Sequence, residues 1–184
     1  MPVVKLQRGF ARLDALEGRL CVPVNLIARN EFVRSYFTAV SRLGDGIAWY
    51  AMLVVLPVAF GESAWRPTLI MTVTALIAVL LYKLLKESLV RERPFASHLD
   101  VNPVTQPLDQ YSFPSGHTMH ATAFIVQLAV YYPDVMWLML PFAVSVAVSR
   151  VILGLHYPSD VLAGVLIGWA LARTSLLLAA GLPA

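Results

Sequence analysis

The stretch TLIMTVTALIAVLLYKLL, residues 68–85, has a single charged side chain, Lys83, among its eighteen residues. A helix that crosses a lipid bilayer needs about 20 predominantly apolar residues, with a range of about 17–25. The stretch lies within that range. We therefore predict that residues 68–85 form a membrane-spanning helix.

Four further apolar stretches lie on either side of this one. They are Ile47–Phe60, His117–Tyr132, Val135–Leu155 and Val161–Leu178. The first two are short for a span, but tyrosine and tryptophan near their ends suit the membrane interface. The pattern predicts an all-α integral membrane bundle with about five spans.

The composition supports a protein whose solvent is partly lipid. The chain is 58% hydrophobic and only 14% charged, with a mean hydropathy of +0.69. Soluble domains are about half apolar and a quarter charged. A net charge of +3 is too small to indicate nucleic-acid binding. We expect the lipid bilayer as a partner, no nucleic acid, and no obligate protein partner.

The N-terminal region differs from the rest of the chain. Phe10, Leu13, Leu16 and Leu20 recur at helical spacing, and a second apolar series with interspersed arginines follows. Such basic amphipathic helices tend to lie in the headgroup plane. The segment Gly44-Asp45-Gly46 then breaks the pattern. We predict interfacial helices in residues 1–44 and a membrane-embedded domain in residues 45–184.

Alternating spans bring certain helix ends to the same membrane face. These are the end of the second span, the start of the third, and the junction between the fourth and fifth. The polar residues at these ends are Lys86, Arg93, Ser115, Gly116, His117, Arg150, His156 and Asp160. Ionisable residues at membrane depth are costly and are usually functional. The set therefore predicts a functional site.

The cations in this set would suit a doubly charged anion. The guanidinium groups of Arg93 and Arg150 match phosphoryl oxygens, and Lys86 adds a third charge. Ser115 and Gly116 lie at a helix start, where free N–H groups also favour an anion.

The histidines in the set could carry out the chemistry. His156 and Asp160 are four residues apart and would share a face of a helical turn. A carboxylate on one imidazole nitrogen fixes the tautomer and leaves the other nitrogen as a nucleophile. His117 is then a candidate general acid.

Three motifs make the chain resemble the type 2 phosphatidic acid phosphatase family. They are K-x6-R-P at Lys86–Pro94, P-S-G-H at residues 114–117, and S-R-x5-H-x3-D at Ser149–Asp160. The resemblance covers roughly Thr68 to Leu178. The family shares its core with bacterial acid phosphatases and vanadium haloperoxidases. Many bacterial members have six spans, whereas we count five here.

The resemblance implies a role for each matched residue. His156 would form a phosphohistidine, Asp160 would orient it, and His117 would protonate the leaving group. The phosphate would be held by Lys86, Arg93, Ser115, Gly116 and Arg150. The family reaction is independent of metal, so we expect no cofactor.

Several functions stay open at this point. We expect a lipid phosphate as substrate, first a polyprenyl diphosphate such as undecaprenyl diphosphate. Phosphatidylglycerophosphate, phosphatidic acid and a lipid A phosphate are alternatives. A haloperoxidase is disfavoured by the hydropathy. A non-catalytic transport or binding protein on the same scaffold is disfavoured because His117, His156 and Asp160 are all present.

The location of the site follows two conflicting rules. The basic residues of the N-terminal region fall on the site's side of the membrane, and the positive-inside rule would place both in the cytoplasm. Resemblance to polyprenyl diphosphate phosphatases implies an outer-facing site instead. We expect a multi-pass protein of the bacterial inner membrane with the site on the outer face. Arg91, Glu92 and His98 are expected to be solvated loop residues.

Overall fold

The computed structural model describes residues 2–107 and 109–181, with side chains from residue 10 onward. This part of the chain consists of helices and connecting segments, with no strand. The all-α prediction is confirmed. The outermost ends of the two predicted domains, residue 1 and residues 182–184, lie outside the described residues.

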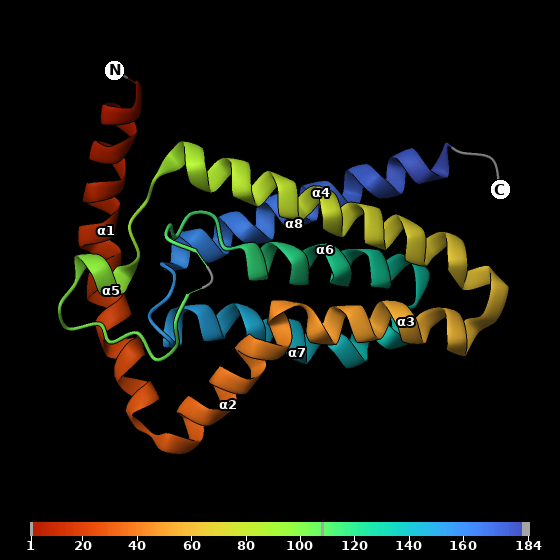
Figure 1. Cartoon of the computed structure of the whole chain (residues 1–184), viewed down its shortest axis with the longest axis horizontal. Coiled ribbons are helices and arrows are strands. Elements are labelled where there is room, and N and C mark those ends of the chain that lie inside the picture. The colour runs from red at the N-terminus through yellow and green to blue at the C-terminus, as the bar shows by residue number, and fades with distance from the viewer. Residues whose placement is uncertain (1, 108, 182–184) are drawn as a thin grey trace.

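Five long helices form the bundle and run side by side (Figure 1). They are α3 (Ala48–Phe60), α4 (Trp65–Leu89), α6 (Gly116–Tyr131), α7 (Pro133–Ile152) and α8 (Pro158–Ala180). Each corresponds to one predicted apolar stretch. By length and composition, three described segments qualify as candidate spans: residues 31–97, 133–152 and 158–180. The first contains both α3 and α4, so the predicted number of spans stays a prediction.

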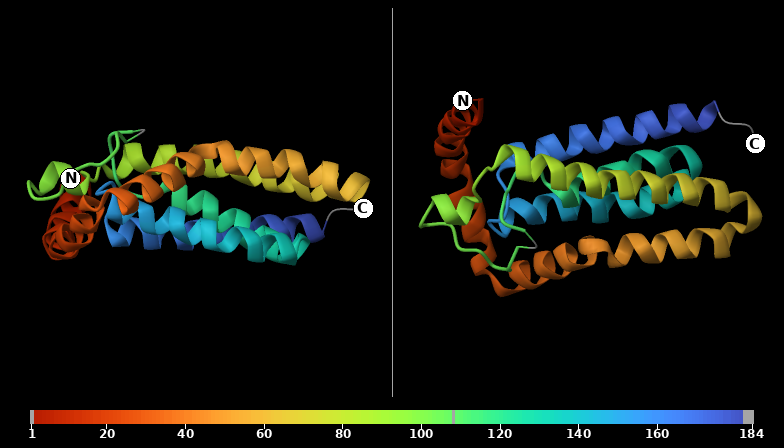
Figure 2. Two further views of the ribbon diagram at one scale, coloured as in Figure 1. Left: turned by 90° about the horizontal axis from the view of Figure 1, so that it is seen from below. Right: turned by 45° about the horizontal axis from the view of Figure 1, so that its top comes forward.

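The N-terminal helices lie at one end of this bundle (Figures 1 and 2). Helix α1 (Pro2–Leu26) crosses that end, and the short turn η1 (Ile27–Arg29) leads to α2 (Glu31–Arg42). Asn30 begins α2, because its side-chain oxygen accepts hydrogen bonds from the backbone N–H groups of Phe32 and Val33 at 3.0 and 3.2 Å.

Helix α1 turns its polar side toward the protein. Glu17 and Asn25 are buried, whereas Leu16 and Leu20 are 63% and 58% exposed. The Asn25 amide donates to the carbonyl oxygens of Asn102 and Ile152, both at 3.0 Å. An exposed apolar side suits a helix at a lipid interface. The division at residues 44 and 45 stays a prediction.

The predicted break at residues 44–46 is a bend without a loop. Helix α2 continues into α3 through the π-helical turn η2 (Leu43–Ile47). Gly46 has φ +146° there, a conformation that side chains other than glycine rarely adopt. The bend changes the direction of the chain from the end of the bundle into the bundle itself.

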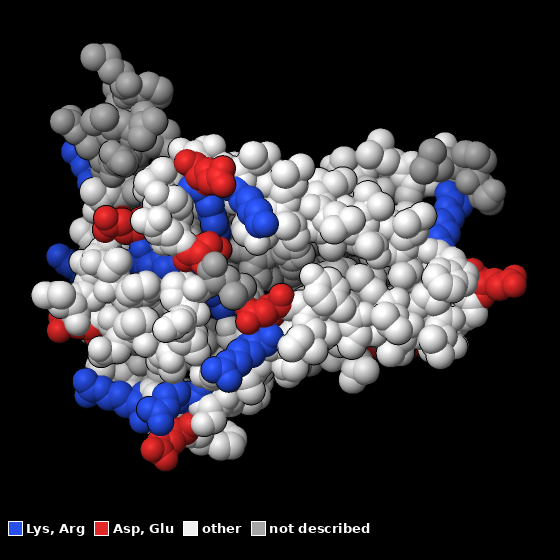
Figure 3. Space-filling view, viewed as in Figure 1, with Lys and Arg blue, Asp and Glu red and all other residues white. Residues whose placement is uncertain are grey.

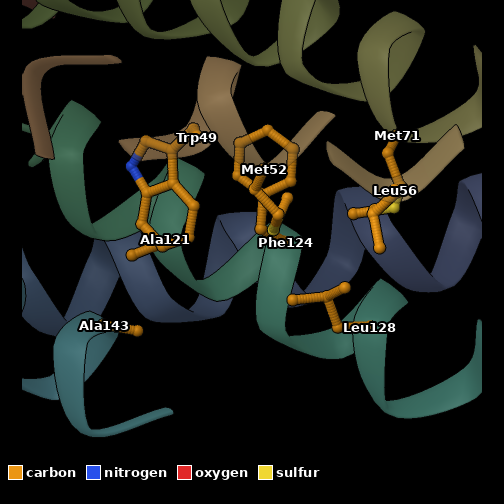
Figure 4. Packing of buried hydrophobic residues seen from close by; sticks show 8 residues of the cluster. All are labelled: Trp49, Met52, Leu56, Met71, Ala121, Phe124, Leu128 and Ala143. Atoms are coloured by element: carbon orange, nitrogen blue, oxygen red, sulfur yellow. The ribbon is translucent and has the colours of Figure 1, made fainter. Parts of the chain in front are cut away.

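The largest apolar core lies between α3, α4, α6 and α7 (Figure 4). The Trp49 ring of α3 stacks on the Phe124 ring of α6, with centroids 5.0 Å apart and planes 13° apart. Met71 of α4 and Leu128 of α6 are fully buried in the same cluster. This core holds α3 and α4 against α6 and α7.

Helix α6 packs closely on α8 through glycine. A Cβ atom on Gly168 would lie 2.3 Å from the carbonyl oxygen of Met119, and one on Gly164 would lie 2.7 Å from that of Ser115. The starts of the two helices are also joined, because the Ser115 N–H donates to the Asp160 carbonyl oxygen at 3.1 Å. Close packing therefore places the start of α6 beside the α7–α8 turn.

The outer surface of the bundle is apolar. Large exposed hydrophobic side chains on the four peripheral helices include Val58, Leu69, Leu80, Leu138, Leu162 and Leu177. An exposed apolar surface of this extent marks contact with lipid or another protein. The long segment from Val90 to Ser115, which includes the short helix α5 (Pro94–Ser97), covers the polar end.

Candidate active site

Charged side chains gather at the end of the molecule that carries α1, α2 and the long segment (Figure 3). A cavity of about 310 Å³ opens there. Six of the eight predicted site residues line it, namely Lys86, Arg93, Gly116, His117, Arg150 and His156. The structure therefore brings together residues that lie up to seventy positions apart in the sequence.

His156 lies in the turn between α7 and α8 and is 1% exposed. Its backbone N–H donates to the Arg150 carbonyl oxygen at 3.0 Å. Its Nε2 lies 3.4 Å from the Arg93 guanidinium, and its Nδ1 lies 3.6 Å from the Asp160 carboxylate. The second distance is longer than a hydrogen bond. Asp160 is thus adjacent to His156, and Nδ1 has no hydrogen-bond partner among the described residues.

The protonation state of His156 suits a nucleophile. Burial lowers its pKa well below 6.5, and the positive charges of Arg93, Arg150 and Lys86 lower it further. The ring is therefore neutral at physiological pH, as attack through a ring nitrogen requires.

Two contacts hold the Asp160 carboxylate. One oxygen accepts from the Tyr157 backbone N–H at 2.8 Å, which caps the start of α8. The other accepts from the Arg91 guanidinium at 2.5 Å. The position of Asp160 beside His156 is set by the cap and by Arg91.

Asp109 forms ion pairs with two of the cations that were predicted to bind phosphate. One of its carboxylate oxygens accepts from Lys86 Nζ at 2.6 Å and from the Arg93 guanidinium at 2.7 Å. Burial raises the pKa of Asp109, but the hydrogen bonds and charges of Lys86 and Arg93 outweigh burial, so the pKa is lowered overall. Sequence reasoning missed this residue, whose only signal is its acidity in a polar loop between two motifs.

Arg150 is buried, and not all of its hydrogen-bond donors have a partner among the described residues. Its side chain is held by a hydrogen bond from one terminal nitrogen to the Ser41 hydroxyl of α2. Its Nε has no partner among the described residues. Arg93 is anchored in a similar way, since it donates to the Leu155 carbonyl oxygen at 2.7 Å. Arg150 and Arg93 both line the cavity, so two buried guanidinium groups contribute positive charge to it.

Ser115 and Gly116 begin α6 in different ways. Ser115 is fully buried, shares a hydrogen bond of 3.0 Å with the Thr118 hydroxyl, and does not line the cavity. Gly116 lines it, and a Cβ atom there would lie 3.3 Å from the Tyr82 ring. The helix start thus faces the cavity through Gly116, where the helix dipole favours an anion.

His117 contacts a carboxylate that the sequence motifs do not include. Its Nε2 forms a short hydrogen bond with a carboxylate oxygen of Asp45, in the turn η2. Both residues line the cavity. The signal for Asp45 was its place between Gly44 and Gly46, where the helical pattern breaks.

The prediction that Arg91 is a solvated loop residue is wrong. Arg91 is 1% exposed and donates to Asp14 and Glu17 of α1, at 2.7 and 2.6 Å, as well as to Asp160. The acidic side of α1 covers it. His98 is half-buried against the same helix, with Nε2 3.1 Å from the Asp14 carbonyl oxygen, whereas Glu92 is exposed as expected.

The cavity is polar at one end and apolar along its walls. Beyond the charged residues it is lined by Leu53 of α3, Leu76 and Val79 of α4, and Phe124 of α6. This combination fits a molecule with an anionic head and an apolar body.

Comparison with known proteins agrees with this arrangement. The family model described as PAP2 superfamily matches residues 67–181. A Rhizobium etli protein named lipid A 1-phosphatase is 33% identical over 111 residues, 58% of this chain and 48% of that protein. A Sulfolobus acidocaldarius protein named undecaprenyl-diphosphatase is 36% identical over 133 residues, 70% of this chain and 62% of that protein. The chain thus matches about half to three fifths of the length of these relatives.

A solved structure is similar over nearly the whole chain. It is described as a transmembrane PAP2-type phosphatidylglycerolphosphate phosphatase from Bacillus subtilis. The TM-score is 0.74 at 25% identity, with 98% of this chain and 97% of that chain covered. Together with the apolar helices, this likeness identifies the chain as a multi-pass membrane protein.

Proposed function

This chain belongs to the PAP2 superfamily, and from that premise we propose that it is a metal-independent phosphatase of membrane lipid phosphates that acts through a phosphohistidine. The observation that carries the proposal is the cavity itself. Three cations and three histidines line it, and its walls continue as an apolar surface between α3, α4 and α6.

The proposed reaction begins with binding of the phosphoryl group. Lys86, Arg93 and Arg150 hold its oxygens, and the start of α6 at Gly116 adds a favourable dipole. Asp109, which now bonds Lys86 and Arg93, yields its place to the substrate. Charge that develops on the phosphoryl oxygens is then met by preorganised donors.

Covalent transfer follows in two steps. Nε2 of His156 attacks the terminal phosphorus, the bond to the leaving oxygen breaks, and His117 gives its proton to that oxygen, which is the bridging oxygen of a diphosphate or the ester oxygen of a monophosphate. Water then attacks phosphorus, His117 takes up a proton from it, the bond from phosphorus to His156 Nε2 breaks, and inorganic phosphate leaves. Each step uses a ring that the structure holds at the cavity, so no further group is required.

We propose a polyprenyl diphosphate such as undecaprenyl diphosphate as the substrate, which the Sulfolobus relative's name supports. Phosphatidylglycerophosphate is the second candidate, because the similar structure that covers 98% of the chain carries that description. A lipid A phosphate is supported by the name of the Rhizobium relative, and phosphatidic acid completes the set. We place the protein in the bacterial inner membrane with the site on the outer face.

Phosphate release from detergent-solubilised protein tests the proposal. The substrates are a polyprenyl diphosphate, phosphatidylglycerophosphate, phosphatidic acid and a soluble phosphomonoester, each in excess EDTA. We expect EDTA-resistant release that disappears in His156→Ala. His98→Ala is the matched control, because His98 lies outside the cavity.

The results separate the parts of the proposal. The fastest lipid identifies the substrate class. Full activity of His156→Ala would remove the assigned nucleophile, and loss of release in EDTA would contradict the metal-independent route. Absence of release from every substrate by folded protein would contradict the proposed activity.

A further inference from the structure

The turn η2 brings a carboxylate to the proposed general acid, and we propose that Asp45 is a positioning residue that acts through His117. The inference rests on the proposed function, because it assigns a partner to the residue that protonates the leaving group. Asp45 belongs to none of the three motifs. It reaches the site from the segment that links the N-terminal helices to the bundle.

Two glycines allow Asp45 to approach. Gly46 adopts φ +146°, which bends the chain next to Asp45. Gly44 is buried, and a Cβ atom there would lie 3.0 Å from the Val146 side chain of α7 and 3.7 Å from the His117 ring. Side chains at these positions would strain the bend or push it away from α6 and α7. The sequence Gly-Asp-Gly thus sets a carboxylate against His117.

The contact assigns different tasks to the two ring nitrogens of His117. The Nε2–H group donates a hydrogen bond to the Asp45 carboxylate. The described residues supply no hydrogen bond to Nδ1. A carboxylate on one nitrogen fixes the tautomer and the ring orientation, and it leaves the other nitrogen to exchange protons.

The proton therefore moves through Nδ1. In the first step the bond from phosphorus to the leaving oxygen breaks, and the Nδ1 proton passes to that oxygen. In the second step Nδ1 takes up a proton from the attacking water. Asp45 keeps its hydrogen bond to Nε2 throughout and neither gains nor loses a proton.

An alternative role for Asp45, competition with the substrate, predicts a different effect of its removal. If its carboxylate merely occupied the place of the substrate in the empty cavity, its removal would leave kcat unchanged or higher and would lower KM. If it positions His117, its removal lowers kcat and kcat/KM, and the loss of kcat/KM is greatest where the leaving oxygen most needs a proton.

The experiment is a double-mutant cycle on two substrates. Short-chain phosphatidic acid has an alkoxide leaving group that needs protonation, whereas p-nitrophenyl phosphate has one that does not. Wild type, Asp45→Asn, His117→Ala and the double variant are compared, with Asp45→Glu as the conservative variant. Glu31→Gln is the matched control, because it removes the same charge from an exposed side chain of α2.

We expect Asp45→Asn to lower kcat/KM for phosphatidic acid roughly tenfold or more, within the contribution typical of general acids. The loss for p-nitrophenyl phosphate is much smaller, the double variant is no slower than His117→Ala, and Asp45→Glu recovers part of the activity. Glu31→Gln matches wild type.

Other outcomes overturn the inference. Equal losses of kcat/KM on both substrates, or losses that multiply in the double variant, would show that Asp45 does not act through His117, because kcat/KM reports formation of the phosphohistidine and not its hydrolysis. A lower KM with undiminished kcat in Asp45→Asn would show that the Asp45 carboxylate competes with the substrate instead. Failure of the proposed function is visible separately, as a wild type without EDTA-resistant activity or an active His156→Ala.

Discussion

A carboxylate sits where the proposed substrate would place a phosphoryl oxygen. Asp109 accepts hydrogen bonds from Lys86 and Arg93, and its side chain is 35% exposed at the cavity. An anion that enters must replace these contacts. Asp109 therefore neutralises the cations while the cavity is empty and competes with the substrate for them.

Removal of this carboxylate should tighten anion binding. We expect Asp109→Asn to lower the dissociation constant of orthovanadate severalfold, because charge-assisted hydrogen bonds to Lys86 and Arg93 no longer compete. Isothermal titration in detergent measures it. Asp100→Asn, an exposed acidic residue of the same loop, is the control. Weaker binding by Asp109→Asn would show instead that Asp109 orients the cations for the substrate.

The residues that sequence reasoning found and missed differ in one physical respect. Lys86, Arg93, His156 and Asp160 have recognisable spacings within short motifs. Asp45 meets His117 across 72 positions, and Arg91 meets Asp14 across 77. Single charges that pair over such distances leave no periodic pattern, and only the folded chain shows their partners.

The long helices could be predicted from their apolar runs, even where two of those runs are short for a span, but the ends of the helices follow other rules. Helices α7 and α8 start earlier than expected, at Pro133 and Pro158, because proline is well suited to the first turn of a helix. Helix α4 runs beyond the apolar stretch to Leu89 and ends where Val90 adopts φ +46°. Charged residues continue the helix beyond the apolar stretch, so a prediction from hydropathy alone places its end too early.

Helix α1 is tied to the α7–α8 turn through one buried guanidinium. Arg91 bonds Asp14 and Glu17 on one side and Asp160 on the other, and its guanidinium lies 4.2 Å from the centre of the Tyr157 ring. Glu17 also accepts hydrogen bonds from the Ser159 backbone N–H and hydroxyl, both at 2.7 Å. The element that looks peripheral in the sequence thus completes the support of the site.

Loss of this guanidinium should destabilise the protein strongly. Arg91→Met leaves buried carboxylates uncompensated, which costs about 3–5 kcal/mol where one partner of a buried pair is removed. We expect a clear fall in the apparent Tm, measured in detergent. Arg34→Met is the matched control, because Arg34 is half exposed and its pair with Glu31 contributes little. If Arg91→Met melted at the same temperature as Arg34→Met, α1 would not be held through Arg91.

At the scale of the whole molecule, polar and apolar surfaces are separated along the bundle axis. Most charged side chains lie at the end that carries the cavity, whereas a smaller number lie at the other end, with the α3–α4 turn η3 (Gly61–Ala64) and the end of α8 (Figures 1 and 3). In a bilayer, the two ends would face opposite compartments. Orientation therefore decides which pool of lipid phosphate the cavity meets.

Cysteine labelling in intact cells should reveal the orientation. The only cysteine, Cys21, is fully buried, so the unchanged protein serves as the unlabelled control. Leu99→Cys, where the side chain is 98% exposed at the site end, should react with an impermeant maleimide, and Ser63→Cys in η3 should not. The reverse pattern would place the site in the cytoplasm, in line with the positive-inside rule.

The inward-facing polar side of α1 affects the order in which the protein assembles during synthesis. Asp14 and Glu17 leave the ribosome before their partners, since Arg91 follows Asp14 by 77 positions and Ser159 follows Glu17 by 142. Until those residues emerge, the two carboxylates have no buried partner, while Leu16 and Leu20 can already rest on the lipid surface. Helix α1 is consequently translated before the residues that hold it, and we expect its docking to follow the insertion of α8.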